Sequence, residues 1–130
     1  MIRVLIADDQ PRARRSLQAL LTAMRWSHTS GGAHRDRLME IIGEATNGQQ
    51  VIDQVLSLQP EVVVMDLHLP MLDGLTVISI IKRRWPDVRI VVLTMYATDR
   101  VAALQAGADA FLLKGCPTGE LLAAVRPGLG

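Results

Sequence analysis

Residues 62–66 read Val-Val-Val-Met-Asp, four consecutive apolar residues followed by an acid. A run of this length that does not alternate with polar residues is typical of a short strand buried on both faces, as in a parallel sheet covered by helices. Four other short runs rich in Val, Ile and Leu occupy residues Ile2–Ala7, 39–43, 90–93 and Ala110–Leu113. The sequence therefore predicts five buried strands.

The stretches that follow these runs carry apolar residues three or four positions apart, which is the spacing of one helix face. In the first stretch these residues are Leu17, Leu20, Leu21 and Met24. The pattern recurs after each strand and is weakest between residues 94 and 114. Strand and helix thus alternate along the chain, which predicts a doubly wound α/β domain with right-handed crossovers.

Composition narrows the class of protein. The chain has 130 residues, 49% of them hydrophobic, and a formal net charge of +1, so charge alone selects neither nucleic acid nor an anionic membrane. Its only cysteine, Cys116, excludes an internal disulfide and a thiolate metal cluster, which favours a reducing compartment. We recognise no signal peptide and no apolar run long enough to span a membrane, so a cytoplasmic protein is expected.

Two segments interrupt the strand and helix pattern. Residues 25–38 are polar and rich in Gly and Ser, which predicts a long loop before the second strand. Residues 126–130 contain Pro127, which ends the last helix early, and they read as a C-terminal tail. We therefore expect a single domain over residues 1–125.

Chemically useful residues follow four of the five predicted strands. Asp8 and Asp9 follow the first strand, Asp66 the third, Thr94 the fourth and Lys114 the fifth. In a doubly wound sheet, ligands bind outside the carboxyl ends of the strands. These side chains are therefore expected to converge in one crevice.

Three carboxylates in one crevice repel each other unless a cation neutralises them. Hard oxygen ligands without nearby thiolate or imidazole select Mg²⁺. A carboxylate can also accept a phosphoryl group as an acyl phosphate. Transfer then depends on in-line positioning and on neutralisation of the phosphoryl oxygens. Mg²⁺, the Lys114 ammonium and the Thr94 hydroxyl can each serve one of those oxygens.

Four stretches combine these residues with their flanking sequence. They are residues 5–9 (Leu-Ile-Ala-Asp-Asp), 64–74 (Val-Met-Asp-Leu-His-Leu-Pro-Met-Leu-Asp-Gly), 92–94 (Val-Leu-Thr) and 111–114 (Phe-Leu-Leu-Lys). In this order the stretches resemble receiver domains of two-component response regulators. Residues 8–15 and 43–48 resemble especially the NarL/LuxR-type subfamily, which carries a C-terminal helix-turn-helix domain. The resemblance implies a flavodoxin-like fold, a five-stranded parallel sheet in the order 2-1-3-4-5 with helices on both faces.

The resemblance also implies roles for the site residues. Asp66 is the implied phosphoacceptor, assisted by Thr94 and Lys114. The implied Mg²⁺ ligands are Asp9, Asp66 and the backbone carbonyl of His68, with Asp8 acting mostly through water. Thr94 and Phe111 form the implied switch pair, in which Thr94 moves toward the phosphoryl group and the Phe111 ring turns inward.

Partners follow from the same resemblance. It implies a histidine kinase as phosphodonor and a homodimer on phosphorylation. DNA is contacted only through a C-terminal domain that these 130 residues do not contain, so transcriptional control belongs to a longer protein, and no membrane partner is expected. The domain is not expected to be an enzyme beyond phosphoryl transfer to itself and autodephosphorylation.

Two alternative functions stay open. The segment from Thr94 to Lys114 is shorter than the family norm by about two residues, which admits a phosphorylation-independent interaction module with a receiver fold. An aspartyl-phosphate phosphatase would use the same nucleophile and metal. Such enzymes usually carry a second acid two residues after the nucleophile, where this chain has His68.

Overall fold

The computed structural model describes residues 1–27 and 39–126. Strands and helices alternate along these residues, as the apolar pattern predicts. In chain order the elements are β1 (Ile2–Ala7), α1 (Pro11–Ser27), β2 (Met39–Ala45), α2 (Gly48–Leu58), β3 (Val62–Met65), α3 (Gly74–Arg84), β4 (Arg89–Thr94), the 3₁₀ turn η1 (Ala97–Asp99), α4 (Arg100–Ala106), β5 (Ala110–Leu113) and α5 (Thr118–Val125).

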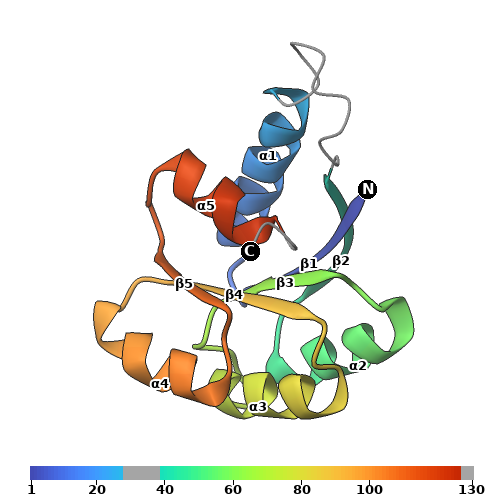
Figure 1. The fold of residues 1–130 in the computed structure, drawn as a ribbon, viewed down its shortest axis with the longest axis vertical. Coiled ribbons are helices and arrows are strands. Elements are labelled where there is room, and N and C mark those ends of the chain that lie inside the picture. Colours follow the sequence, from blue (N-terminus) through green and yellow to red (C-terminus); the bar gives the residue numbers. More distant parts are fainter. Residues whose placement is uncertain (28–38, 127–130) are drawn as a thin grey trace.

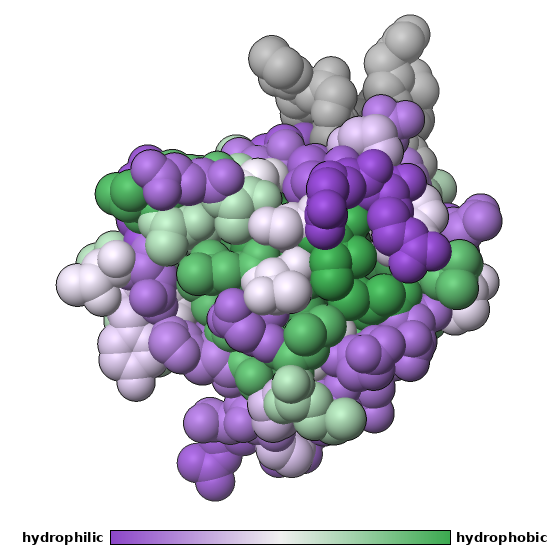
Figure 2. All heavy atoms as spheres, turned by 90° about the horizontal axis from the view of Figure 1, so that it is seen from below, coloured by the Kyte–Doolittle hydropathy of each residue, from purple (hydrophilic) through white to green (hydrophobic). Residues whose placement is uncertain are grey.

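The five strands form one parallel sheet in the order β2-β1-β3-β4-β5, which confirms the predicted topology. Helices α1 and α5 cover one face of the sheet, and α2, α3 and α4 cover the other (Figure 1). Figure 2 views the molecule from the α2–α4 side and shows apolar side chains gathered toward the middle of this face, between hydrophilic ones. Within the described ranges, no helix combines the length and apolar character that crossing a bilayer requires.

Each strand contributes to two hydrophobic cores because successive side chains point to opposite faces of the sheet. In β3, Val63 packs into the core beneath α2, α3 and α4, whereas Val64 packs into the core beneath α1 and α5. All four residues of β3 are buried. The run that predicts the fold is therefore the central strand, covered on both sides.

Element boundaries depart from the sequence prediction at several ends. Strand β2 continues to Ala45, two residues beyond the predicted run, because the backbone pairing with β1 continues to Ala7. Helix α1 continues to Ser27, so the predicted loop of residues 25–38 starts too early, and its residues 28–38 lie outside the described ranges. Residues 127–130 of the predicted tail also lie outside them.

The weak periodicity between residues 94 and 114 corresponds to a short element. Helix α4 has only 7 residues and is preceded by the 3-residue turn η1. It ends at Gly107, whose φ of 118° lies in the left-handed region that glycine adopts without strain. The connection from β4 to β5 is thus compact, and it brings η1 close to the carboxyl end of the sheet.

Ile78 offers a test of the core beneath α3, because its side chain is fully buried there. We expect Ile78→Ala to lower the free energy of unfolding by about 2–5 kcal/mol, through lost burial and a residual cavity. Urea unfolding followed by circular dichroism measures the change. The control Leu56→Ala removes a similar side chain that is 56% exposed, and a change beyond about 0.5 kcal/mol there would contradict this description.

Candidate functional site at the carboxyl edge of the sheet

The carboxyl ends of the strands place the candidate residues along one edge of the sheet. Asp8 and Asp66 directly follow β1 and β3, which are neighbours in the sheet. The backbone N–H of Asp66 donates to the Ala7 carbonyl at 3.0 Å, which continues the strand pairing up to the predicted phosphoacceptor. On the other side, the Lys114 N–H donates to the Thr94 carbonyl at 2.8 Å. Strand pairing therefore extends to the backbone of Asp66, Thr94 and Lys114.

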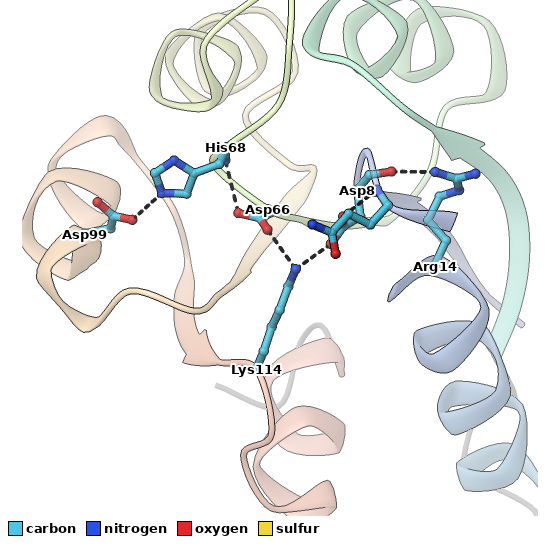
Figure 3. Close-up of polar contacts among 7 residues, drawn as sticks. Asp8, Arg14, Asp66, His68, Asp99 and Lys114 are labelled. Carbon is cyan, nitrogen blue, oxygen red and sulfur yellow. Dashed lines mark hydrogen bonds and ion pairs between the residues drawn. The ribbon is translucent and has the colours of Figure 1, made fainter. Parts of the chain in front are cut away.

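The Lys114 ammonium bridges the two buried carboxylates (Figure 3). Its Nζ lies 2.7 Å from Asp8 Oδ2 and 2.8 Å from Asp66 Oδ2. The Asp8 and Asp66 side chains are only 8% and 10% exposed, so their charges would be costly without a partner. Lys114 supplies that partner to both.

The environment of Lys114 also sets its protonation. Burial alone acts to lower the pKa of Lys114, because it penalises the charged form. Hydrogen bonds and charge attraction from Asp66 and Asp8 outweigh burial, and the pKa of Lys114 is raised above its ordinary value. The ammonium therefore stays charged throughout the neutral range.

The third predicted carboxylate, Asp9, stands apart from this bridge. Asp9 is exposed, and it lines an open cavity of about 580 Å³ together with Asp66, His68 and Lys114. Across the described residues, no three His, Cys, Asp or Glu side chains are grouped closely enough to enclose a metal ion. The structure thus brings Asp9 and Asp66 to the same cavity, and it pairs Asp66 with an ammonium.

The donor chemistry of this cavity still fits a hard divalent cation. Asp9, Asp66 and the backbone carbonyl of His68 come from residues that all line it, and they offer oxygen atoms of the kind that Mg²⁺ prefers. Cys116, the chain's one cysteine, is absent from its lining. The residues therefore fit the predicted metal in chemistry, although they do not enclose a site for it.

The predicted switch residues are both buried. Thr94 is fully buried, and within the described residues its Oγ1 has no hydrogen-bond partner. Phe111 packs in the core on the α4 side, with the Arg100 guanidinium 5.8 Å from its ring centroid. The ring therefore already occupies an inward position, and Thr94 carries an unused donor at the end of β4.

His68 contacts the site in a way that the sequence did not indicate. Its backbone N–H donates to Asp66 Oδ1 at 3.1 Å, and its ring Nε2 lies 2.8 Å from Asp99 Oδ2 (Figure 3). Tyr96 packs edge-on against the same ring, with centroids 4.9 Å apart. No motif marks Tyr96 or Asp99, because both lie in the irregular connection after β4.

Arg14 is a second contact that sequence analysis missed. Its guanidinium donates to the Asp8 carbonyl oxygen at 2.7 Å (Figure 3). It also pairs with Glu44 at 3.1 Å. Arg14 thereby ties α1 to the end of β1 and to β2. The sequence shows a basic first turn of this helix, but only the fold shows which arginine turns inward.

Comparison with known proteins identifies the family. The response regulator receiver domain model matches residues 4–126. The chain belongs to the response regulator receiver domain family. The predicted family is therefore confirmed, and its matched residues include every site residue discussed above.

The relatives differ in how much of their length this chain matches. The transcriptional regulatory protein LiaR of Bacillus subtilis is 34% identical over 128 residues, which are 97% of this chain and 55% of LiaR. A protein-glutamate methylesterase/protein-glutamine glutaminase of Pseudomonas fluorescens is 34% identical over 116 residues, which are 87% of this chain and 28% of that protein. This chain thus spans about a quarter of the methylesterase and about half of LiaR. In both relatives the similarity is confined to part of a longer protein.

Solved structures include receivers of the predicted NarL/LuxR type. The signal receiver domain of the putative response regulator NarL from Mycobacterium tuberculosis is 26% identical, with a TM-score of 0.77. The match covers 95% of this chain and 92% of that domain. The similarity therefore extends over nearly the whole fold.

Thr94 gives a stability test of the unpaired hydroxyl. We expect Thr94→Val to raise the free energy of unfolding by about 1 kcal/mol, because an apolar methyl replaces a buried hydroxyl that lacks a partner. The control Thr76→Val removes a hydroxyl that bonds Asp73 Oδ2 at 3.2 Å and is not expected to stabilise. Urea unfolding measures the free energy of unfolding of both variants. A Thr94→Val variant less stable than the parent would show that the hydroxyl has a partner.

Lys114 gives a pH test. A lysine whose pKa is raised on folding stabilises the fold fully below its unfolded pKa of about 10.4, and the stabilisation is lost as pH rises through the folded value. We expect the parent to be more stable than Lys114→Met at pH 7–9. Urea unfolding from pH 7 to 11.5 should show this difference narrowing above about pH 10.4. A difference that stays constant over the whole range would contradict the bridge.

Proposed function

We propose that this chain is a phosphoacceptor receiver domain, phosphorylated on Asp66 by a histidine kinase in a Mg²⁺-dependent reaction. The observation that carries the proposal is the contact of a buried Asp66 carboxylate with the Lys114 ammonium at the edge of an open cavity. A carboxylate at the edge of an open cavity can be reached by a phosphoryl donor from the cavity side. This geometry favours in-line attack.

The proposed reaction transfers one phosphoryl group from a phosphohistidine of the kinase to Asp66. An oxygen of Asp66 bonds to phosphorus as the bond from phosphorus to the donor's histidine nitrogen breaks, and the electron pair leaves with that nitrogen. Asp9, Asp66, the His68 carbonyl and, through water, Asp8 would hold Mg²⁺, which would supply positive charge to the phosphoryl oxygens. Lys114 lies within reach of the Asp66 carboxylate and can neutralise a second oxygen.

Thr94 and Phe111 are proposed as the switch pair. The buried and unpaired Thr94 Oγ1 supports this role, because a phosphoryl oxygen on Asp66 would give it the partner that it lacks. The Phe111 ring already packs inward beside α4, so the proposed switch would involve its movement between this inward position and an outward one. Movement of Thr94 toward the phosphoryl group would bias the domain toward one conformer, which is how a local modification produces a change at a distant surface.

The biological setting is proposed on the same basis. Residues 1–125 form the receiver and residues 126–130 a tail, and phosphorylation promotes a homodimer. LiaR is named as a transcriptional regulatory protein, and the corresponding output here would be DNA binding through a further C-terminal domain. The domain acts in the cytoplasm, which a single cysteine and a phosphohistidine donor both favour, and it turns over no external substrate.

One observation favours a second candidate, a receiver fold that acts without phosphorylation. Lys114 already pairs with both Asp8 and Asp66, and a lysine held between two buried carboxylates can serve as a purely structural contact. A phosphatase finds less support, because the residue two positions after Asp66 is His68, whose ring binds Asp99. Label that is released catalytically would indicate a phosphatase, and absence of Mg²⁺-dependent label would indicate the interaction module.

Asp66→Asn tests the proposal directly. Incubation of the parent with acetyl phosphate and Mg²⁺ should add one phosphoryl group in the intact mass, and omission of Mg²⁺ should prevent it. We expect Asp66→Asn to abolish the added mass, because an amide cannot form the acyl phosphate. The control Asp53→Asn changes an exposed acid on α2 and should label like the parent. Equal labelling of Asp66→Asn would exclude Asp66 as the acceptor.

A further inference from the structure

His68 connects the phosphoacceptor to the segment that follows β4. Its backbone N–H donates to Asp66 Oδ1, and its ring reaches across to Asp99 at 2.8 Å and to Tyr96 at a 4.9 Å centroid separation. Asp99 is the last residue of η1, and Tyr96 directly precedes that turn. The ring of His68 is therefore held by two residues of the segment that follows β4.

The Asp99 carboxylate contacts His68 and does not cap helix α4. It stands directly before α4, yet its side chain makes no capping hydrogen bond there. An ionised carboxylate can only accept, so the Nε2–H of His68 donates to Asp99. The contact joins residues 31 positions apart and ties the β3–α3 loop to the start of α4.

The consequence for the site follows from the backbone of His68. The ring, the N–H that contacts Asp66 and the carbonyl proposed as a Mg²⁺ ligand belong to one residue. Fixing the ring limits the conformations of the loop, and it therefore preorganises both backbone groups before a cation or phosphoryl group arrives.

We propose that Asp99 is a positioning residue of the phosphoryl-transfer site, which acts by holding the His68 ring so that the His68 backbone faces Asp66 and the cation. The inference rests on the proposed Mg²⁺-dependent function. Side chains of His68 and Asp99 are 55% and 27% exposed, so the contact is a solvent-screened one of modest strength. We expect a correspondingly modest effect, on the order of two- to fivefold.

The test measures binding of Mg²⁺ alone to the 130-residue chain, by following backbone amide shifts in NMR titrations. We expect Asp99→Ala to raise the Mg²⁺ dissociation constant by about two- to fivefold. Asp99→Asn keeps an oxygen that accepts from His68 and should recover most of the affinity. The matched control Thr98→Ala changes an exposed neighbour in the same turn and should bind like the parent.

A mutant cycle separates positioning from general structural damage. In a His68→Ala background, which keeps the backbone carbonyl, Asp99→Ala should cause no further loss of affinity. Thermal unfolding of all variants shows whether each one folds. Labelling with acetyl phosphate should slow in Asp99→Ala to a degree that saturating Mg²⁺ largely restores.

The Mg²⁺ dissociation constants of the parent and of Asp99→Ala distinguish failure of this inference from failure of the proposed function. A parent that binds Mg²⁺ and an Asp99→Ala variant with the same or lower dissociation constant would overturn this inference and leave the proposed function intact. A parent without Mg²⁺ binding would overturn both. An equal loss for Asp99→Ala in the presence and absence of the His68 ring would show that Asp99 acts by another route.

Discussion

The ammonium of Lys114, held between two buried carboxylates, is the interaction on which the site depends. Asp8 and Asp66 end adjacent parallel strands, so their side chains necessarily emerge close together at one edge of the sheet. Lys114 follows β5, which β4 separates from β3, and its long side chain must cross the end of β4. The residue at that end is Thr94, whose small side chain is fully buried. Its small size thus leaves a path for the lysine, and among the described residues its hydroxyl has no hydrogen-bond partner.

The fold was largely predictable because burial on both faces leaves a plain signal in the sequence. Strand β3 reads as a continuous apolar run, since Val63 and Val64 each enter a different core. The signal weakens where an element is half exposed. Strand β2 runs on through the exposed Glu44, because backbone pairing with β1 needs no apolar side chain. Its end was therefore misjudged by two residues, whereas the order of the strands was predicted correctly.

Some residues of the candidate site were likewise predictable from the sequence, and others were not. Asp8, Asp66 and Lys114 were predictable because each adjoins a strand, and the topology then determines where the strand ends. Asp99 and Arg14 were not, since their roles depend on how far a side chain reaches across space. Arg14 is one of several arginines in the first turn of α1, and only its contacts with the Asp8 carbonyl and Glu44 distinguish it. Periodicity reports which face of an element is buried, and it says nothing about polar partners far apart in the chain.

The bridge also explains why a lysine suits this position under the proposed function. In the described conformation its single charge is shared by two carboxylates. A divalent cation beside Asp66 would repel the ammonium and compete with it for the same carboxylate oxygens, which would weaken the hold of Asp8 and Asp66 on Lys114. A flexible stem with a point charge can then turn toward a phosphoryl oxygen, which the planar fork of an arginine does less readily. One residue would thus serve as counter-ion before phosphorylation and as phosphate ligand after it, and the raised pKa of Lys114 keeps it charged for both roles.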